Sequence, residues 1–435
     1  MLKRMLRRLA GVRPPSKRAA LGDDDADDEG EIVGIDKPPE PKEFSVTLPA
    51  GYPARRIDVR LSVPALPADS PYRFSDHVTD ELGRPTRTIL ATTTGGFGIS
   101  HDLGETWKHI PVRAHKTHRF IHVRSIGNSE YLAQAQFERD PTKTVPLDLL
   151  VIDEAGNVRA KHRAHGTRWH GCRAIDQSNG TIMYAEYPSG DNPRPSRVFR
   201  SRDRGRSWDV AFERNSEQIR HFHFLQANPR VAGEWWLTSG DNPEECRIWL
   251  SKNDGEGWVD YTDIPETIDI DGVTYPRSIF RLTDLAWDGD EIIWGTDDTL
   301  PLVTGDSPGA RVFRSAIKRP FAPRPVGHCR WHIRSIVDVG EFYFVLTQGS
   351  NRGRASPEER KPNVLLMPKK SPPGAPGLLH LFDVDIHSPK PRAGRGFTYS
   401  KASRAAIGGT FFTYRAPFHV WPAGHQILRW DVTFS

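Results

Sequence analysis

The sequence predicts an all-β protein folded as a seven-bladed β-propeller, because two series of short apolar segments each recur seven times. The predicted third strands of the blades are Phe97–Ser100, Leu149–Ile152, Arg197–Ser201, Arg247–Ser251, Arg311–Ser315, Asn363–Met367 and Gln426–Trp430. The predicted second strands, rich in aromatic and β-branched residues, are Thr88–Thr92, Glu130–Gln134, Thr181–Ala185, Glu234–Thr238, Glu291–Gly295, Glu341–Leu346 and Thr410–Tyr414. A period of about 50 residues with several short strands in each unit is typical of propeller blades. Six blades is the alternative count.

Three of the third strands are followed by one eight-residue pattern, Ser-x-Asp/Asn-x-Gly-x-x-Trp, which begins at Ser100, Ser201 and Ser251. In a hairpin the acid accepts hydrogen bonds from turn amides, the glycine takes a backbone angle that other residues resist, and the tryptophan packs between sheets. The pattern resembles the Asp-box, or BNR repeat, of sialidase-like β-propellers, and this implies a fold but little chemistry. We expect the closing tryptophans to be largely buried; they are Trp107, Trp208 and Trp258.

The repeat assigns residues 43–435 to the propeller. Few residues follow the third strand of the last blade, Gln426–Trp430, so we expect the N-terminal segment Phe44–Leu48 to pair with it and close the ring, which removes an exposed sheet edge. A hydrophobic content of 37% with 12 Trp and 20 Phe suffices for packing between blades. No apolar run approaches the roughly 20 residues of a membrane span. Three scattered cysteines predict small buried thiols, not a disulfide framework or a zinc site.

Residues 1–42 are predicted to be a basic amphipathic segment followed by a disordered acidic and proline-rich tether. Cations interrupt the apolar residues of Met1–Ala10, so this segment is no signal peptide. On a helix it has a basic and an apolar face, which suits peripheral contact with an anionic membrane. A frayed basic tail is the alternative, and the sequence leaves both open. We therefore expect a cytoplasmic protein, held at the inner membrane face where residues 1–10 act as an anchor.

The position of a residue within a blade predicts which face of the propeller it occupies. Adjacent strands run in opposite directions, so the starts of innermost strands and the ends of second strands share one face, opposite the Asp-box turns. The segments predicted to begin innermost strands are basic and rich in histidine: His118–His122, His170–Arg173, Arg220–His223, Arg277–Arg281 and His328–Arg334. Because the formal net charge is only +5, this local concentration of cations suggests an anionic ligand. About half of these side chains are expected to pack between blades instead.

Carboxylates follow the second strands of three consecutive blades. Asp191 and Asp241 lie in a repeated Ser-Gly-Asp-Asn-Pro pentad, and the next blade has Asp297 and Asp298. Asp-Asn-Pro is an ordinary turn sequence, so we interpret the pentads as turn-makers and predict functional roles only for Asp297 and Asp298. Carboxylates beside imidazoles can perform general acid–base chemistry on a sugar.

These considerations define a candidate site. The predicted catalytic residues are His170, His221, Tyr187 and Asp297. The predicted ligand-binding residues are Arg173, Arg220, His223, Arg281, Asp298, His332 and Arg334. The His-x-His sequence at His221 and His223, with a histidine from a neighbouring blade, would also suit a metal ion. We nevertheless predict no metal and no cofactor.

The resemblance to sialidases does not extend to their active site. Sialidases bind the sugar carboxylate with three arginines, one of them in a short Arg-Ile-Pro motif near the N-terminus, whereas the sequence here is Arg56-Ile57-Asp58. Arg220, Arg281 and Arg334 are of the right type but match no spacing rule. Propeller-type polysaccharide lyases are more similar in residue types, because they use His and Tyr as base and acid and Arg against a uronate carboxylate; Tyr184 and Tyr187 are the tyrosines available.

The sequence therefore predicts a protein that binds an acidic carbohydrate, uronate-like or sialate-like. Whether it also cleaves this ligand, as a glycoside hydrolase or a polysaccharide lyase, is left open. The alternative is a non-catalytic propeller that holds a protein or glycan in surface-polysaccharide assembly. No nucleic-acid partner is predicted, because the basic residues sit among carboxylates and form no recognised module.

Overall fold

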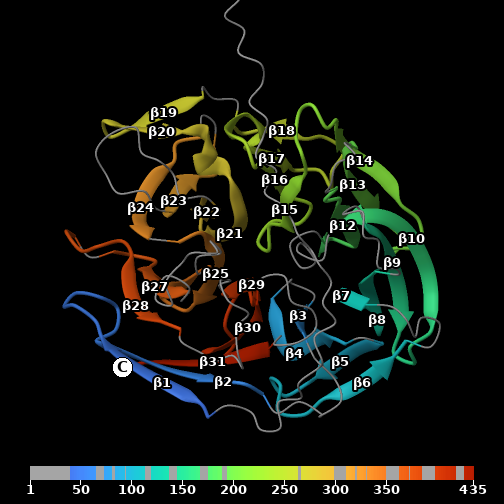
Figure 1. Ribbon diagram of the computed structural model, residues 1–435, viewed down its shortest axis with the longest axis horizontal. Coiled ribbons are helices and arrows are strands. Elements are labelled where there is room, and N and C mark those ends of the chain that lie inside the picture. The colour runs from blue at the N-terminus through green and yellow to red at the C-terminus, as the bar shows by residue number, and fades with distance from the viewer. Residues whose placement is uncertain are drawn as a thin grey trace, which may run out of the picture. The chain divides into compact units, whose positions relative to one another are not determined.

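The computed structural model describes residues 40–64, 73–80, 84–93, 95–112, 119–136, 145–166, 175–188, 194–262, 266–297, 310–318, 321–329, 331–348, 362–371, 373–384, 397–417 and 426–435. These residues form seven antiparallel sheets arranged as the blades of a propeller (Figure 1). The predicted fold class, with seven blades and not six, is confirmed. The predicted basic segment and most of the tether, residues 1–39, lie outside the described residues.

Six blades are four-stranded, and the first strand of each is innermost. Blade 1 consists of β3 (Arg73–Thr79), β4 (Pro85–Thr92), β5 (Gly96–Ser100) and β6 (Lys108–Pro111). Blade 2 consists of β7 (Arg119–Gly127), β8 (Glu130–Gln136), β9 (Val145–Asp153) and β10 (Val158–Gly166). Blade 3 consists of β11 (Ile175–Ser178), β12 (Thr181–Ala185), β13 (Ser196–Ser201) and β14 (Asp209–Arg214). Blade 4 consists of β15 (Phe222–Ala227), β16 (Trp235–Ser239), β17 (Arg247–Ser251) and β18 (Val259–Asp260). Blade 5 consists of β21 (Leu282–Asp288), β22 (Glu291–Thr296), β23 (Ala310–Ala316) and β24 (Arg324–Cys329). Blade 6 consists of β25 (Ile333–Val339), β26 (Phe342–Thr347), β27 (Asn363–Pro368) and β28 (Leu379–Asp383).

The seventh blade joins the two ends of the propeller domain. It contains β29 (Phe397–Ala402), β30 (Thr410–Pro417), β31 (Gln426–Phe434), β2 (Arg56–Ser62) and β1 (Lys42–Thr47), in that order. Each predicted second and third strand coincides with a strand of its blade. A short hairpin of β19 (Thr267–Ile270) and β20 (Val273–Pro276) and two 3₁₀ turns, η1 (Pro243–Glu245) and η2 (Arg277–Phe280), complete the described elements.

The ring closes through an N-terminal strand, but the strand that pairs with β31 is the one that follows the predicted strand in the sequence. Phe44–Leu48 falls mainly on β1, which pairs with β2, whereas β2 pairs with β31. Ile57, Val59 and Leu61 of β2 are buried, and the residues between them face outward. This alternation is what a strand with one face against the core requires. It makes β2 the better partner for the buried strand β31 and leaves β1 as a fifth, outer strand.

The core lies in layers between neighbouring blades. In one such layer Trp236 of blade 4 packs with Trp294 and Phe313 of blade 5, and the two latter rings stack with centroids 5.7 Å apart. Buried carboxylates add polar contacts between innermost strands. Asp284 on β21 accepts hydrogen bonds from the backbone N–H of Leu285 and, at 2.9 Å, from that of Ile336 on β25. Such contacts fix the position of one blade against the next.

The Asp-box-like turns have the predicted hydrogen bonds. The backbone N–H of Thr106 donates to Asp102 at 2.9 Å, that of Ser207 to Asp203 at 2.8 Å, and that of Gly257 to Asn253 at 3.0 Å. The three tryptophans are half-buried, and so less enclosed than predicted, but each packs against a core cluster; they are Trp107, Trp208 and Trp258. The first two also donate their indole N–H to the glycine carbonyl of the turn.

No described helix is long and apolar enough to cross a membrane. Cys246 and Cys329 are buried thiols, as predicted, and burial raises the pKa of each to about 12. Cys172 lies outside the described residues.

Candidate functional site

The candidate site lies at one end of blades 4, 5 and 6. In each of these blades the start of the innermost strand pairs with the end of the second strand; the pairs are Phe222–Ser239, Leu282–Thr296 and Ile333–Thr347. Residues just before the innermost strands therefore meet residues just after the second strands. In blade 4, Ser251 pairs with Trp235 at the start of β16, so the Asp-box-like turn that follows lies at the opposite end. In this blade the segment predicted to carry the site and the Asp-box-like turn lie at opposite ends, as predicted.

Two buried imidazoles meet at the start of β15. His221 and His223 are 2% and 3% exposed, and their Nε2 atoms lie 3.1 Å apart. The register of β15 against β16 shifts between Phe222 and Phe224, which marks a bulge at His223. A bulge changes the direction of the side chain that it carries. It therefore contributes to the close approach of two side chains that lie two residues apart.

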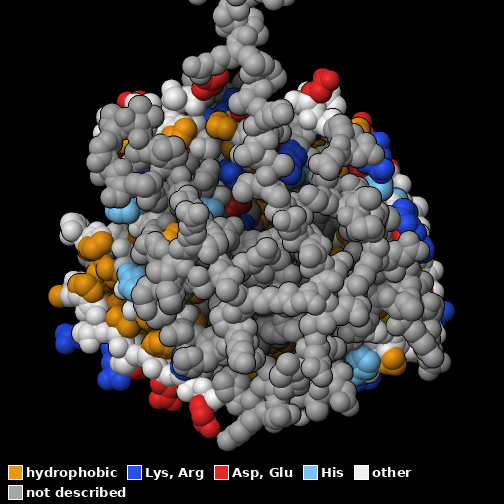
Figure 2. All heavy atoms as spheres, viewed as in Figure 1, with side chains coloured by type: hydrophobic (Ala, Val, Ile, Leu, Met, Phe, Trp, Pro, Cys, Tyr) orange, Lys and Arg blue, Asp and Glu red, His pale blue; other side chains and the backbone are white. Residues whose placement is uncertain are grey.

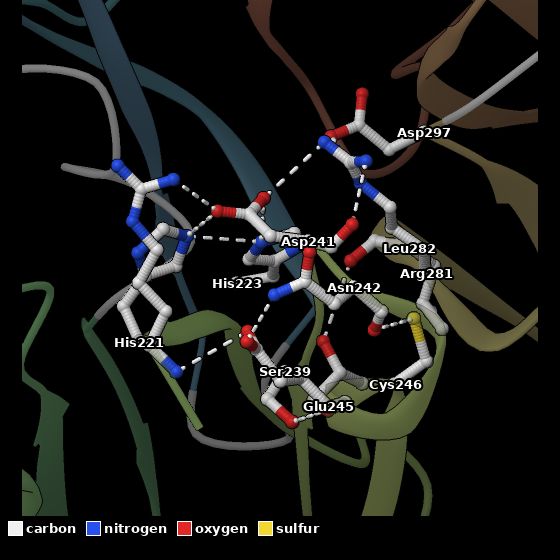
Figure 3. A network of polar contacts seen from close by, with 12 residues as sticks. His221, His223, Ser239, Asp241, Asn242, Glu245, Cys246, Arg281, Leu282 and Asp297 are labelled. Carbon is white, nitrogen blue, oxygen red and sulfur yellow. Dashed lines mark hydrogen bonds and ion pairs between the residues drawn. The ribbon is translucent and has the colours of Figure 1, made fainter. Parts of the chain in front are cut away.

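Asp241 lies at the centre of the site (Figure 3). Its carboxylate is 3.5 Å from Nε2 of His221 and 3.4 Å from Nε2 of His223. Arg220 donates to Oδ2 at 2.9 Å, and Nη2 of Arg281 lies 3.2 Å from Oδ1. Four polar side chains from the starts of two innermost strands are thus connected through one carboxylate.

The backbone around Asp241 is unusual. Its φ is +124°, in a region that a residue with a side chain rarely adopts. A Cβ atom on the preceding Gly240 would lie 3.0 Å from Cγ of Arg281 and 3.2 Å from Cε1 of His223. Glycine at 240 therefore allows the loop to approach the histidine closely. Strained residues of this kind cluster at functional sites, where surrounding contacts maintain them.

A second carboxylate, Asp297, follows β22. It is 6% exposed, and its Oδ1 accepts from Nη1 of Arg334 at 2.7 Å and lies 3.7 Å from Nδ1 of His332. Nε of Arg281 lies 3.9 Å from Oδ2, so this arginine stands between the two carboxylates. Arg334 also donates to the side chain of Gln348 at 2.6 Å. We call the connected side chains the Asp241 cluster: Arg220, His221, His223, Asp241, Arg281, Asp297, His332 and Arg334.

Both carboxylates of the Asp241 cluster are ionised at neutral pH. Burial raises the pKa of Asp241, but the hydrogen bond from His223 and the charges of the histidines and of Arg281 outweigh it and hold the pKa well below its usual range. For Asp297 burial is likewise outweighed, by Arg334 and Arg281 first, and its pKa is lowered. Neither group can act as a general acid near neutral pH.

Two residues of blade 3 keep their protons more readily. The ring of Tyr187 stacks on that of His221 with centroids 3.7 Å apart, and burial together with the charge of Asp241 raises its pKa. Its neighbour Glu186 is 2% exposed, and burial raises its pKa to about 7. Oε1 of Glu186 accepts from the backbone N–H of His165 at 3.0 Å. Of these two, only the carboxyl of Glu186 changes protonation close to neutral pH.

The structure brings together all eight of the predicted site residues that it describes: Arg220, His221, His223, Arg281, Asp297, His332, Arg334 and Tyr187. His170, Arg173 and Asp298 lie outside the described residues, as does Asp191. Asp241, which the sequence assigns to turn-making, also has polar contacts beyond the turn, because its carboxylate lies between the two histidines and two arginines. The sequence did contain a signal, since a carboxylate at this position of the blade recurs in blade 5 as Asp297.

Other residues of the sequence argument have structural roles. His328 lies near the end of β24, the outermost strand of blade 5, and not at the start of an innermost strand. The Tyr184 hydroxyl is buried and donates to the His165 carbonyl at 2.8 Å. Arg56 pairs with Asp58 on the exposed side of β2. His122 contacts Ser75 of the preceding blade at 2.6 Å, which is the inter-blade packing expected for some of the histidines.

The Asp241 cluster is partly open to solvent. The side chain of Arg220 is 58% exposed, while those of Arg281 and Arg334 are each 23% exposed. The space-filling view shows basic, acidic and histidine side chains close together on the face drawn, near β15 and β22 (Figure 2). Within the cluster three guanidinium groups face two carboxylates, which leaves one positive charge in surplus. An anion is the ligand that complements this charge.

Comparison with known proteins finds no family and only distant structural likenesses. No family model matches the sequence, and no curated protein matches it. Similar solved structures include YCF48 from Cyanidioschyzon merolae (TM-score 0.49, 10% identity, 85% of this chain and 98% of that chain). Another is the extracellular domain of a putative one component system from B. thetaiotaomicron (TM-score 0.46, 9% identity, 87% of this chain and 40% of that chain). A third is an ancestral GH74 enzyme (TM-score 0.45, 13% identity, 84% of this chain and 47% of that chain). The chain is a β-propeller.

Proposed function

We propose that the protein binds a carboxylate-bearing carbohydrate, such as an oligosaccharide of uronic acids, at the Asp241 cluster. The observation that carries the proposal is the convergence of three guanidinium groups on two carboxylates at one end of the blades, with one positive charge in surplus. A ligand carboxylate neutralises this charge and occupies donors that point outward.

Arg220 is the group best placed to meet the ligand. More than half of its side chain is exposed. A guanidinium group has five N–H donors, and the described bond to Asp241 is made by a donor on Nη1. The remaining donors can form the paired hydrogen bonds that arginine makes with a carboxylate. Arg281 and Arg334 are less exposed and bond the aspartates, so their main effect on the ligand is their charge.

The carbohydrate part of the proposal rests on the polar groups beside Asp297. Sugar hydroxyls both donate and accept, and the partly exposed His332 and Arg334 lie beside Asp297 and offer groups of both kinds. This argument supports binding. Turnover is a separate question, because the two carboxylates of the cluster are ionised and engaged by arginines.

Calorimetric titration with trigalacturonate, in buffer containing EDTA, tests the proposal. The matched control ligand is the methyl ester of the same trisaccharide, which has the same rings without the charges. We expect binding of the acid but not of the ester, with an affinity that falls as salt rises. The Arg220→Gln variant is expected to weaken binding by about tenfold, the loss of one charge-assisted interaction of 1–2 kcal/mol.

The matched control protein is Arg202→Gln. Arg202 is also half-exposed and paired with a carboxylate, but it lies in an Asp-box-like turn. Equal affinities of the parent for acid and ester, or equal losses in the Arg220→Gln and Arg202→Gln variants, would contradict the proposal. Ultraviolet absorbance of an unsaturated product, followed in the same samples, distinguishes a lyase from a binding protein.

A further inference from the structure

We propose that Nε2 of His221, Nε2 of His223 and a carboxylate oxygen of Asp241 form a binding site for a divalent transition-metal ion, with Zn²⁺ as the occupant that fits best. The sequence offers His221 and His223 with a histidine from another blade as metal ligands, and it predicts no metal. The new observation is the third ligand, a carboxylate of the same blade. The inference is independent of the proposed carbohydrate ligand.

The distances are close to those between the corners of a zinc tetrahedron. The two Nε2 atoms are 3.1 Å apart; Oδ2 of Asp241 lies 3.5 Å from Nε2 of His221, and its other oxygen, Oδ1, lies 3.4 Å from Nε2 of His223. Zinc lies about 2.0–2.2 Å from nitrogen and oxygen ligands, so at tetrahedral angles its ligand atoms are about 3.3–3.5 Å apart. In the part of the chain that the structure describes, this is the only group of three histidine, cysteine or acidic residues whose ligand atoms all lie within 4.8 Å of one another.

The local backbone holds these three ligands in place. The bulge at His223 directs its imidazole toward that of His221, and the ring centroids are 5.0 Å apart. The carboxylate is supplied by a residue with φ of +124°, next to a glycine that leaves room for the His223 ring. Each of these features costs stability by itself. Together they place one carboxylate against two buried imidazoles, an arrangement that a bound cation would stabilise.

Two imidazoles and one carboxylate form an open site. Three protein ligands leave a fourth tetrahedral position for water or for an oxygen of a ligand. The same donor set also suits Fe²⁺. Cys246 lies in the loop after β16, and its Sγ donates to the carbonyl oxygen of Asn242 at 3.2 Å. The proposed site therefore uses nitrogen and oxygen ligands and no thiolate.

The neighbouring arginines oppose the metal ion and provide a distinctive test. Arg220 and Arg281 bind the same carboxylate, at 2.9 Å and 3.2 Å, and a divalent ion would be repelled by both. Arg220 is exposed and can turn into solvent, at the cost of its bond to Asp241. Removing its charge should therefore strengthen metal binding, whereas removing a ligand should abolish it. A general loss of structure cannot produce both results.

The test uses the full-length protein, treated with EDTA and then freed of it, with Zn²⁺ alone as the probe and a chromophoric chelator as competitor. The parent is expected to bind one equivalent. The His223→Ala and Asp241→Asn variants should lose about 100-fold or more in affinity, and Arg220→Gln should gain several-fold. His380→Ala, which removes an exposed histidine that also pairs with an aspartate, is the matched control and should bind as the parent does.

A second measurement does not depend on any variant. Co²⁺ added to the parent should give the visible absorbance of a tetrahedral ion with nitrogen and oxygen ligands, without the charge-transfer band of a thiolate. A parent that binds no Zn²⁺, or that loses no affinity in His223→Ala, would overturn the inference, as would a thiolate band. Because no carbohydrate is present here and EDTA is present in the carbohydrate titration, either proposal can fail alone.

Discussion

Replacing Glu186 with glutamine is expected to stabilise the propeller at pH 8 and to have little effect at pH 4. The side chain is 2% exposed, and burial raises its pKa to about 7 from an ordinary value of 4.5. Glutamine has the same shape and keeps an oxygen that can accept the hydrogen bond from the His165 backbone. The substitution therefore removes a buried negative charge and little else.

The sign follows from proton binding. The folded protein holds the Glu186 proton up to a higher pH than the unfolded chain does, so the free energy of unfolding falls as pH rises from 4.5 to about 7. One pKa unit corresponds to about 1.4 kcal/mol, so this interval corresponds to about 3 kcal/mol. This pKa already includes the attraction of the Glu186 carboxylate to Arg197, and we therefore expect a net gain of up to about 3 kcal/mol at pH 8.

Urea unfolding of parent and variant at both pH values measures the effect. Other groups titrate in the same range, since burial lowers the pKa of His77, His162 and His165. These contributions are nearly the same in both proteins, and the difference between parent and variant isolates residue 186. Glu213→Gln is the matched control, because Glu213 is an exposed glutamate that bonds Arg197. A gain that is the same at both pH values, or that also occurs in the control, would refute the reasoning.

Three further predictions concern the fold and the N-terminus. The Asp284→Ala substitution should lower the free energy of unfolding in urea by about 1–3 kcal/mol, because the buried N–H of Ile336 loses its acceptor. An equally large decrease for Asp209→Ala, which removes an exposed aspartate, would contradict this prediction. Hydrogen bonds within their turns lower the pKa of Asp102 and Asp153 to about 2, and for Asp203 burial is outweighed by the bonds from Ser207, with the same result. The stability that these ionised carboxylates contribute above pH 3.8 should be lost as the pH falls toward 2. Melting curves across this range should show a smaller loss for the Asp203→Asn variant than for the parent. Deleting residues 1–10 should abolish flotation with anionic vesicles, and unchanged flotation would leave only the frayed-tail alternative.

Much of the fold was predictable because each blade repeats the same physical requirement. A strand between two sheets must be apolar, and a hairpin needs residues that tolerate unusual backbone angles, so both leave a periodic trace in the sequence. Ring closure left a weaker trace. The alternation of Ile57, Val59 and Leu61 is as clear as the pattern of Phe44–Leu48, but the number of strands added by the N-terminus depends on the length of the connecting loop and on the exposed edge of β31.

The position of the candidate site was predictable from strand direction, whereas its central residue was not. Asp241 has the sequence context of an ordinary turn, and only its φ of +124° and the bulge at His223 bring its carboxylate onto the two imidazoles. Neither feature has a residue pattern of its own. Sequence reasoning therefore identified the charged groups around the centre, and it assigned the carboxylate that connects them to a structural role.

Both proposed ligands would involve Asp241, and Arg220 is expected to affect them in opposite directions. While Arg220 bonds Asp241, its remaining donors would be available to an anionic ligand; a metal ion bound to Asp241 would repel the arginine. Arg220→Gln should then weaken the binding of trigalacturonate and strengthen that of Zn²⁺. If both occur, Zn²⁺ and the acidic sugar should also reduce each other's affinity for the parent protein. If instead the sugar carboxylate takes the fourth position on the metal ion, the two should increase each other's affinity. The sign of this coupling, measured by titrating trigalacturonate with and without Zn²⁺, shows whether the ion and the sugar occupy one site in turn or together.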